Sequence, residues 1–412
     1  MAVGDSYFVQ TFTTTLQRYE KQLVDNVLLE HPVLELFKSS AKSITGRGLV
    51  IPVRGVALEG TGYVNASAAS AQFSTGFSND TLGSVVYDWA DEILTPFRLK
   101  HRDILQNTGP EQIVNLVQAY VEGATAAHKD FIVAELHKLR AAWTTGEVLS
   151  LDMLVAATDK ISTTSAGSVG GIRGGDSTVA VTDYERAGTT ATLTIGANDY
   201  IVGDSVVVTG VIAALAGTFT LTAVTATTIS YTTATSATVG TTATTGSVTC
   251  DAIKDYWRAT RISSSAASED IVAAFRRVTN EVFRASRKRP THVICGFTVY
   301  EQLEAFLSGS NSAGYARTLY TNAVGADGKA QTRFTGIQFG DLEVRLDPDC
   351  QDDRAYFLHM PSLRFAYCAG EFMKSYPAQA LEGTLDTVVP LASTILFGVA
   401  ERRANGLLIR TA

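Results

Sequence analysis

Residues 108–143 constrain the fold more than any other stretch, because apolar side chains recur in them every three or four positions. This period is typical of one long amphipathic helix. Thr108 and Glu111 match a capping box, and Pro110 falls in the first turn, where its missing amide proton costs no hydrogen bond. The apolar stripe consists of Ile113, Leu116, Val117, Tyr120, Ala124, Ala127, Phe131, Ile132, Leu136, Leu139 and Trp143.

The predicted helix runs to Trp143: Lys138 and Arg140 lie in its last turns, where cations suit a helix C-terminus, and Gly146 follows just beyond. At about 1.5 Å per residue, the stretch would span roughly 50 Å. That length is unusual for one globular domain. We therefore expect the helix to hold two separate surfaces of the protein a fixed distance apart.

Composition limits the class of protein. The chain has 412 residues, 45% of them hydrophobic and 18% charged, which predicts an ordered protein with a large core. Its net charge of −7 argues against a dedicated nucleic-acid binder, which needs a basic face. The four cysteines form no CxxC pair, so we expect neither a zinc site nor a disulfide framework, and a reducing cytoplasm as the compartment.

No targeting or membrane segment is expected. The N-terminal MAVGDSYFVQ lacks a signal-peptide pattern, and Ala2 excludes N-myristoylation. Between Asp204 and Asp251 no residue is charged, but threonine and glycine interrupt the apolar residues, which alternate with a period of two. That alternation favours strands over a membrane-spanning helix.

Residues 1–46 are predicted to form an N-terminal arm. A helix over Phe12–Leu29 is interrupted by His31 and Pro32, and a short helical piece follows over Val33–Lys38. Two interpretations stay open: a helical hairpin inside a globular core, or an arm that packs on a neighbouring subunit.

Residues 47–106 are predicted to form a long two-stranded hairpin. RGLVIPVRGVA is strand-like, with Pro52 typical of an edge strand, and SVVYDWADEIL and FRLKHRDIL follow a loop over Glu59–Asn79 that is rich in small and polar residues. Such a hairpin is marginal alone, so it needs a surface to pack on.

The chain then changes character. A helix is predicted over Leu149–Ser162, followed by a glycine-rich linker, SAGSVGGIRGGDST. From about residue 176 to 250, short threonine- and valine-rich runs recur at roughly ten-residue intervals, which predicts a small β-sandwich or barrel. Within it, the run GDSVVVTG followed by GTFTLTAVTATTISYTT resembles the immunoglobulin-like modules often inserted in phage structural proteins.

The remaining chain alternates helices and strands. A helix capped by Ser268 ends before Pro290, then come the strand THVIC, a helix over Thr298–Leu307, a loop, and the strands LEVRLDP and RAYFLHM. The C-terminal region after Thr384 is expected to form long, largely buried strands.

No group of residues has the spacing of a known reactive site. SVGGIRGGDST lacks the Gly-Lys-Ser/Thr ending of a phosphate loop, and LSGSNSAG is one residue too long for a nucleophile elbow. His128 and His137 are too far apart on a helix to share a metal ion, so we interpret them as surface or interface residues.

Two charged runs are interpreted as surface features. LDPDCQDDR gathers Asp347, Asp349, Asp352 and Asp353 and could hold a hard cation, but its spacing is not that of an EF-hand, and a solvated turn is favoured. RASRKRP is best explained as a cationic helix C-terminus rather than a nucleic-acid patch.

The order of parts resembles the major capsid proteins of tailed bacteriophages with the HK97-like fold. GRGLVIPVRG, YDWADEILTPFRLKHRDILQNTGPEQIVNLVQAYVEG and RKRPTHVICGFTVYEQLEAFL carry the resemblance. It implies an α+β fold with an inserted all-β domain, similar in kind to that of podovirus coat proteins. The implied parts are an arm (1–46), an extended-loop hairpin with peripheral strands (47–106), a spine helix (107–148), an axial domain (149–172 and 252–376), the inserted domain (173–251) and C-terminal strands (377–412).

The resemblance also implies a function. Copies of the chain would form the hexamers and pentamers of an icosahedral head around double-stranded DNA, bound without sequence specificity, after assembly in the bacterial cytoplasm. A portal and a separate scaffolding protein are implied partners, and a decoration protein stays open; no membrane, cofactor, metal or catalytic residue is implied. The residues expected at subunit contacts are Phe12, Tyr19, Arg47, Arg54, Tyr63, Phe73, Phe77 and Trp89.

Two departures from the family and one alternative matter. No lysine occurs between Lys42 and Lys100, so we predict no covalent crosslink through the extended loop. The hairpin begins by residue 47, so a scaffold is expected to be a separate protein. The alternative is a phage tail or adhesion protein whose β module binds a surface, and an enzyme ranks third.

Overall fold

The computed structural model describes residues 31–55, 82–102, 116–165, 167–308, 317–324, 330–377, 379–380 and 386–411. The predicted helix over Phe12–Leu29, the cap at Thr108 and the hairpin tip over Glu59–Asn79 lie outside these residues. The chain divides into two compact units. Unit 1 includes residues 92–132 and 370–393, and unit 2 includes residues 31–91, 133–369 and 394–412.

The described helices are α2 (Pro32–Ser40), α4 (Leu116–His137), α5 (Leu151–Leu154), α6 (Ile271–Ser286), α7 (Phe297–Ser308) and the 3-10 turns η1 (Arg140–Ala142), η2 (Asp255–Trp257), η3 (Met360–Ser362) and η4 (Arg402–Ala404). The described strands are β1 (Lys42–Ile44), β2 (Gly48–Arg54), β3 (Leu82–Asp88), β4 (Ile93–Leu99), β5 (Arg173–Gly174), β6 (Thr178–Thr194), β7 (Ser205–Thr209), β8 (Gly217–Val224), β9 (Thr228–Thr249), β10 (Ile253–Lys254), β11 (Thr260–Ser265), β12 (His292–Cys295), β13 (Arg317–Val324), β14 (Ala330–Phe339), β15 (Leu342–Leu346), β16 (Arg354–Leu358), β17 (Leu363–Cys368), β18 (Lys374–Ser375), β19 (Gln379–Ala380), β20 (Thr387–Ser393), β21 (Ile395–Val399) and β22 (Gly406–Thr411).

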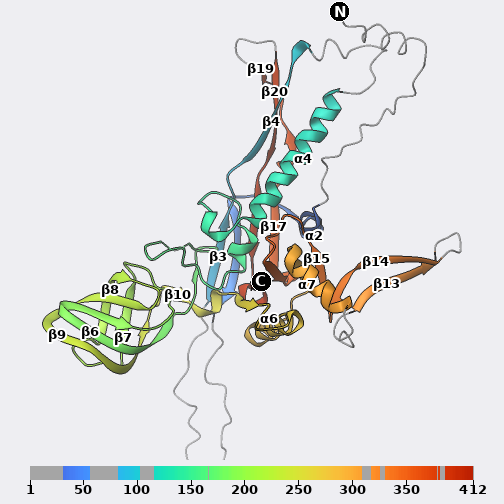
Figure 1. Cartoon of the computed structure of the whole chain (residues 1–412). Helices are drawn as coiled ribbons and strands as arrows, with labels where there is room; N and C mark the ends of the chain where they lie inside the picture. The colour runs from blue at the N-terminus through green and yellow to red at the C-terminus, as the bar shows by residue number, and fades with distance from the viewer. Residues whose placement is uncertain are drawn as a thin grey trace, which may run out of the picture. The chain divides into compact units, whose positions relative to one another are not determined.

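Unit 1 is built on one long strand pair. β4 and β20 pair antiparallel along their full lengths, and β18 and β19 pair with β20 as well (Figure 1). Helix α4 contributes its residues up to Ile132 to this unit. Its buried residues Ala124, His128 and Ile132 are spaced four apart and therefore share one face of the helix.

The largest sheet of unit 2 has seven strands in the order β11-β22-β16-β12-β15-β14-β13. The sheet is mixed: β11 is parallel to β22 and β12 to β15, while β16 is antiparallel to both its neighbours. Helix α6 covers this sheet with Phe275, Val278 and Val282, which belong to one buried cluster with Phe357 and Leu408.

A smaller sheet in unit 2 has the order β1-β17-β21. β21 is buried at every position, as the apolar run ILFGV predicts for a strand covered on both faces. Phe37 of α2 packs edge-on against Phe397 of β21, with 4.7 Å between ring centroids. The predicted short helix over Val33–Lys38 is thereby confirmed as α2, which begins at Pro32.

The threonine-rich segment forms a sheet of its own in unit 2. β9 pairs with β6 along most of its length, with β8 near its start and with β7 near its end, and β7 also pairs with β8. The strands therefore close into a ring around a separate buried cluster that includes Leu193, Tyr200 and Tyr231. The threonines lie mostly on the exposed face, where branched side chains suit a pleated surface.

The structure corrects the predicted ends of two helices. The long helix ends at His137 rather than Trp143, because Leu139 is extended and the backbone amide of Arg140 donates to the carboxylate of Asp152 at 2.9 Å. The helix predicted over Leu149–Ser162 is only α5, because the carbonyls of Met153 and Leu154 accept hydrogen bonds from Arg402 instead of from a following turn.

The prediction of a glycine-rich linker is wrong. Gly170 has φ +64°, and a Cβ there would collide with Val85. Gly174 lies so close to the carbonyl of Trp257 that a Cβ would not fit. The glycines of this segment permit close packing inside unit 2 and do not serve as a flexible spacer.

Two further expectations need correction. Asp270, not Ser268, is the N-cap of α6, and its carboxylate accepts the amide proton of Ile271. Part of the region expected to be a loop after α7 is instead the antiparallel pair β13 and β14. The predicted strands THVIC, LEVRLDP and RAYFLHM are confirmed as β12, β15 and β16.

Candidate assembly surfaces

The base of the hairpin β2–β3 is fixed to the core of unit 2. The buried Tyr87 hydroxyl donates to the carbonyl of Val399 at 2.7 Å and accepts its amide proton at 3.1 Å. The amide of Val86 donates to the carbonyl of Gly170, and that of Ala90 donates to Ile395. Burial raises the pKa of Tyr87 far above its ordinary value, so this hydroxyl stays protonated.

The other face of the hairpin is exposed and carries apolar side chains near its centre. Val50 and Val86 lie directly opposite each other in the register of the two strands, and they are 60% and 44% exposed. Pro52 and Ser84 form the next outward-facing pair and are exposed too. A contiguous apolar pair left in solvent by one chain is a candidate contact surface for another protein.

The predicted contact residues can be placed only in part. Arg47 and Arg54 are exposed at the two ends of β2. Trp89 is half-buried, and its indole NH donates to the carbonyl of Gly46 at 2.7 Å, so it ties the end of β3 to the chain before β2. Phe12, Tyr19, Tyr63, Phe73 and Phe77 lie outside the described residues.

Helix α4 presents large apolar residues to solvent. Tyr120 is 37% exposed and Phe131 49% exposed, so their prediction as core residues of the stripe is wrong. The small residues Gly123 and Ala127 lie between them at helical spacing and are exposed as well. This exposed stripe is a second candidate contact surface.

The two helix histidines are buried, which corrects their interpretation as surface residues. The Nδ1 of His128 lies 2.8 Å from the Thr95 hydroxyl, and its Nε2 lies 2.8 Å from the Ser393 hydroxyl. His128 therefore links α4 to both β4 and β20 inside unit 1. Burial lowers its pKa, so the neutral ring is the form that the fold accommodates.

His137 belongs to unit 2 and lies 3.5 Å from the buried carboxylate of Asp347. Burial alone would raise the pKa of Asp347, but the nearby ring of His137 and the backbone amides of Asp349 and Val33 outweigh it and lower that pKa. Asp349 in turn pairs with His31 at 3.0 Å. Asp347 therefore lies in the core, not in the solvated turn that the sequence predicts.

A buried ion pair holds the place where the threonine-rich segment joins the rest of unit 2. Arg402 and Asp159 are both fully buried and joined by two bonds of 2.7 and 2.8 Å. Arg402 also donates to the carbonyls of Met153, Leu154 and Trp257.

Asp159 additionally accepts the amide proton of Gly174 in β5. β5 pairs in parallel with β10, so the two chain connections of the segment lie side by side next to this ion pair. Arg173 of β5 pairs with Asp204 at 2.7 Å and fixes the segment to its own base.

Among the described residues, no group of three or more histidine, cysteine, aspartate or glutamate side chains has the arrangement of a metal site. No described helix combines the length and apolarity that crossing a membrane requires.

Sequence reasoning missed the Arg402–Asp159 pair, because the partners lie 243 positions apart and no local pattern connects them. The pair Val50–Val86 carried a detectable signal. Both valines lie in predicted hairpin strands, so only the register was needed to bring them together.

Comparison with known proteins identifies the fold. No protein-family profile matches the sequence, and no curated protein does either. Among solved structures, the capsid asymmetric unit of Cyanophage A-1(L) has a TM-score of 0.53 and 11% identity, covering 97% of this chain and 98% of that one. A structure from Mycobacterium phage Bobi has a TM-score of 0.52 and 9% identity, covering 100% of both chains.

These likenesses extend over nearly the whole length of each chain, so they concern the complete arrangement of helices and strands rather than one shared domain. At such low identity they bear on the fold alone. The chain has an α+β fold of the kind found in phage capsid proteins.

Proposed function

We propose that this chain is the major capsid protein of a tailed phage, whose copies assemble into the hexamers and pentamers of an icosahedral head around double-stranded DNA. The observation that carries the proposal is the capsid-type fold over the full chain. Because a fold can host unrelated functions, the proposal also needs surfaces suited to assembly. The exposed Val50–Val86 pair and the exposed stripe of α4 supply two such surfaces.

The parts of the chain take their roles from this proposal. The hairpin within residues 47–106 is the extended loop, residues 107–148 carry the spine helix, and residues 149–172 and 252–376 make the axial domain. Residues 1–46 act as the arm between subunits, 173–251 as an inserted domain and 377–412 as the closing strands. The lack of lysine from residue 43 to 99 supports assembly without a covalent crosslink in this loop.

The proposed partners are other copies of the chain, a separate scaffolding protein, a portal and packaged DNA. The protein acts as a structural component and not as an enzyme. Its net charge of −7 supports loose, sequence-independent contact with the DNA, since like charges repel.

Assembly can be tested by expressing the chain and measuring particle size by sedimentation and negative-stain electron microscopy. We expect shells, capsomers or other large assemblies. The double variant Val50→Asp/Val86→Asp should fold normally, because both side chains are exposed, but should assemble poorly, because a charge would be buried at the contact.

Ile212→Asp is the matched control, since Ile212 is 41% exposed on the threonine-rich segment and not on the hairpin. It should leave assembly unchanged if the hairpin is the contact. A wild-type chain that stays monomeric and binds cell surfaces would instead support a tail or adhesion protein, and would overturn the capsid proposal.

A further inference from the structure

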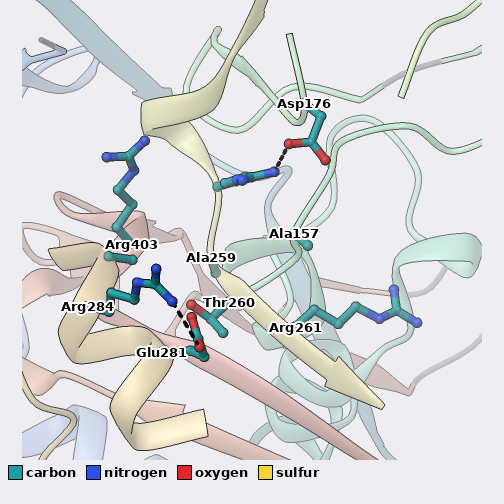
Figure 2. A pocket seen from close by; sticks show the side chains of 10 residues that line it. Ala157, Asp176, Ala259, Thr260, Arg261, Glu281, Arg284 and Arg403 are labelled. Carbon is teal, nitrogen blue, oxygen red and sulfur yellow. Dashed lines mark hydrogen bonds and ion pairs between the residues drawn. The ribbon is translucent and has the colours of Figure 1, made fainter. Parts of the chain in front are cut away.

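A cavity in unit 2 is lined by more positive than negative charge. It has a volume of about 570 Å³ and receives Arg258, Arg261, Arg284 and Arg403, together with Asp176 and Glu281 (Figure 2). That volume is in the range of pockets that hold small ligands. Four arginines that line one cavity stand out in a chain whose net charge is −7.

The four arginines come from separate elements. Arg258 follows η2, Arg261 lies in β11, Arg284 in α6 and Arg403 in η4. Arg284 is in the last turn of α6 and Arg403 in that of the 3-10 turn η4, where a helix end already favours a cation. A helix end therefore does not explain Arg258 or Arg261.

The two carboxylates neutralise only half of this charge. Asp176 pairs with Arg258, and Glu281 lies 3.8 Å from Arg284. Both pairs are largely exposed, so they are weak and easily exchanged. Within the described part of the chain, no ion pair joins a carboxylate to Arg261 or Arg403.

The setting of Arg403 supports a surplus of positive charge. Its guanidinium donates to the backbone carbonyl of Asp255 at 2.8 Å. Burial lowers the pKa of Arg403, and the nearby cation of Arg258 lowers it further. An anion entering the cavity would relieve this repulsion.

The geometry suits phosphate better than carboxylate. A carboxylate is planar and is satisfied by one guanidinium fork, whereas a phosphate group offers more acceptor oxygens and can receive donors from several directions. The arginines that line this cavity belong to separate elements, namely β11, α6, η4 and the chain after η2, so donors are available from more than one element. We propose that this arginine-lined cavity is a phosphate-binding site, occupied by a nucleic-acid backbone or by a free polyphosphate.

The site is tested with inorganic pyrophosphate, titrated by calorimetry into the purified full-length chain at low salt. We expect saturable binding at one site per chain that weakens as salt is added. The variant Arg261→Gln/Arg284→Gln should weaken binding by about tenfold or more, since charge-assisted bonds are lost.

Arg277→Gln/Arg289→Gln is the matched control. Arg277 and Arg289 are exposed cations outside the cavity, and both double variants lower the formal charge from −7 to −9 because each loses two arginines. Binding should be nearly unchanged in this control. If the first variant melts early by circular dichroism, the single Arg261→Gln change at an exposed position serves in its place.

Competition distinguishes the two phosphate sources. A short DNA duplex that displaces pyrophosphate from the wild type, but not from Arg261→Gln/Arg284→Gln, would identify a nucleic-acid backbone. Displacement by a nucleoside triphosphate alone would identify a free polyphosphate.

Three results would overturn the phosphate site: no pyrophosphate binding, equal loss in the control variant, or tighter binding of a polyglutamate peptide than of pyrophosphate. None of them bears on assembly, because particle formation is measured separately by microscopy.

Discussion

The buried ion pair of Arg402 and Asp159 joins several segments that are distant in sequence. Neither side chain is exposed. Arg402 donates hydrogen bonds to the carbonyls at the C-terminal end of α5 and to that of Trp257, and Asp159 accepts the amide proton of Gly174 in β5. Two charges removed from water are tolerated only when paired and fully hydrogen-bonded. Sequence alone could not predict this pair, because an arginine in ERRANG and an aspartate in ATDK are both ordinary surface residues by type.

We predict that Arg402→Met destabilises the fold by about 3–5 kcal/mol, because it leaves the Asp159 carboxylate buried and unpaired. The free energy of unfolding can be measured with urea. Arg402→Met/Asp159→Leu should cost less than the single change, since no charge stays buried. Equal or greater loss in the double variant would show that the carboxylate is not the source of the cost.

His128 should make stability fall in mild acid. Burial lowers the pKa of His128 below its ordinary value of about 6.5. Between the folded and unfolded pKa values, the unfolded chain binds a proton that the folded chain does not, so stability decreases as pH falls. His292 and His359 shift in the same direction, chiefly through burial.

Urea unfolding at pH 7.5 and at pH 5.0 should therefore show lower stability at the acidic pH. In His128→Gln the side chain cannot titrate, so the difference between the two pH values should shrink. An unchanged difference would mean that His128 contributes nothing to the acid sensitivity.

Helix α4 illustrates what periodicity can predict at the scale of an element. The apolar pattern located the helix, because a spacing of three to four is a strong signal over a long stretch. The pattern did not predict correctly which side chains of the helix are buried: Phe131 is exposed, whereas His128 and His137 are buried. Hydrophobicity alone does not reveal a histidine satisfied by two hydroxyls, or an aromatic side chain left in solvent by its own chain.

Adjacent residues of α4 make a direct comparison. Ile132 is fully buried, so Ile132→Ala should cost about 2–5 kcal/mol in the free energy of unfolding. Phe131 is 49% exposed, so Phe131→Ala should change subunit stability by less than about 0.5 kcal/mol. Both values come from chemical denaturation of the isolated subunit, and similar losses would refute the assigned faces.

At the scale of the whole molecule, the order of parts was readable while the contacts between distant segments were not. Strands such as β12, β15 and β16 follow from local composition, but their order in the seven-stranded sheet depends on strands that are distant in sequence, such as β22, which pairs with β16. The glycine-rich stretch was misread for the same reason. Glycine signals either flexibility or close packing, and only the neighbouring Val85 and Trp257 decide between them.

We predict that the threonine-rich sheet can be deleted without unfolding the rest of the chain. Its chain connections, β5 and β10, are paired strands, which lie about 5 Å apart, and its buried cluster is separate from that of the seven-stranded sheet. Replacing residues 176–250 by a Gly/Ser linker of about eight residues should leave the remaining chain folded.

Circular dichroism and hydrogen exchange would report the outcome. Some loss of stability is expected, because Arg173 loses Asp204 and Arg258 loses Asp176. Global unfolding of the shortened chain would show that the sheet is an integral part of the fold.

The way Tyr87 is held has a mechanical consequence. Its hydroxyl is hydrogen-bonded to both the carbonyl and the amide of Val399. The amides of Val86 and Ala90, close by in the chain, donate to the carbonyls of Gly170 and Ile395. A force pulling on the exposed end of β2–β3 would thus be transmitted to β21 in the core and would have to shear several hydrogen bonds together. The described part of the hairpin should therefore move as a rigid element under such a force. It should transmit the force to the subunit core and not extend as a flexible linker would.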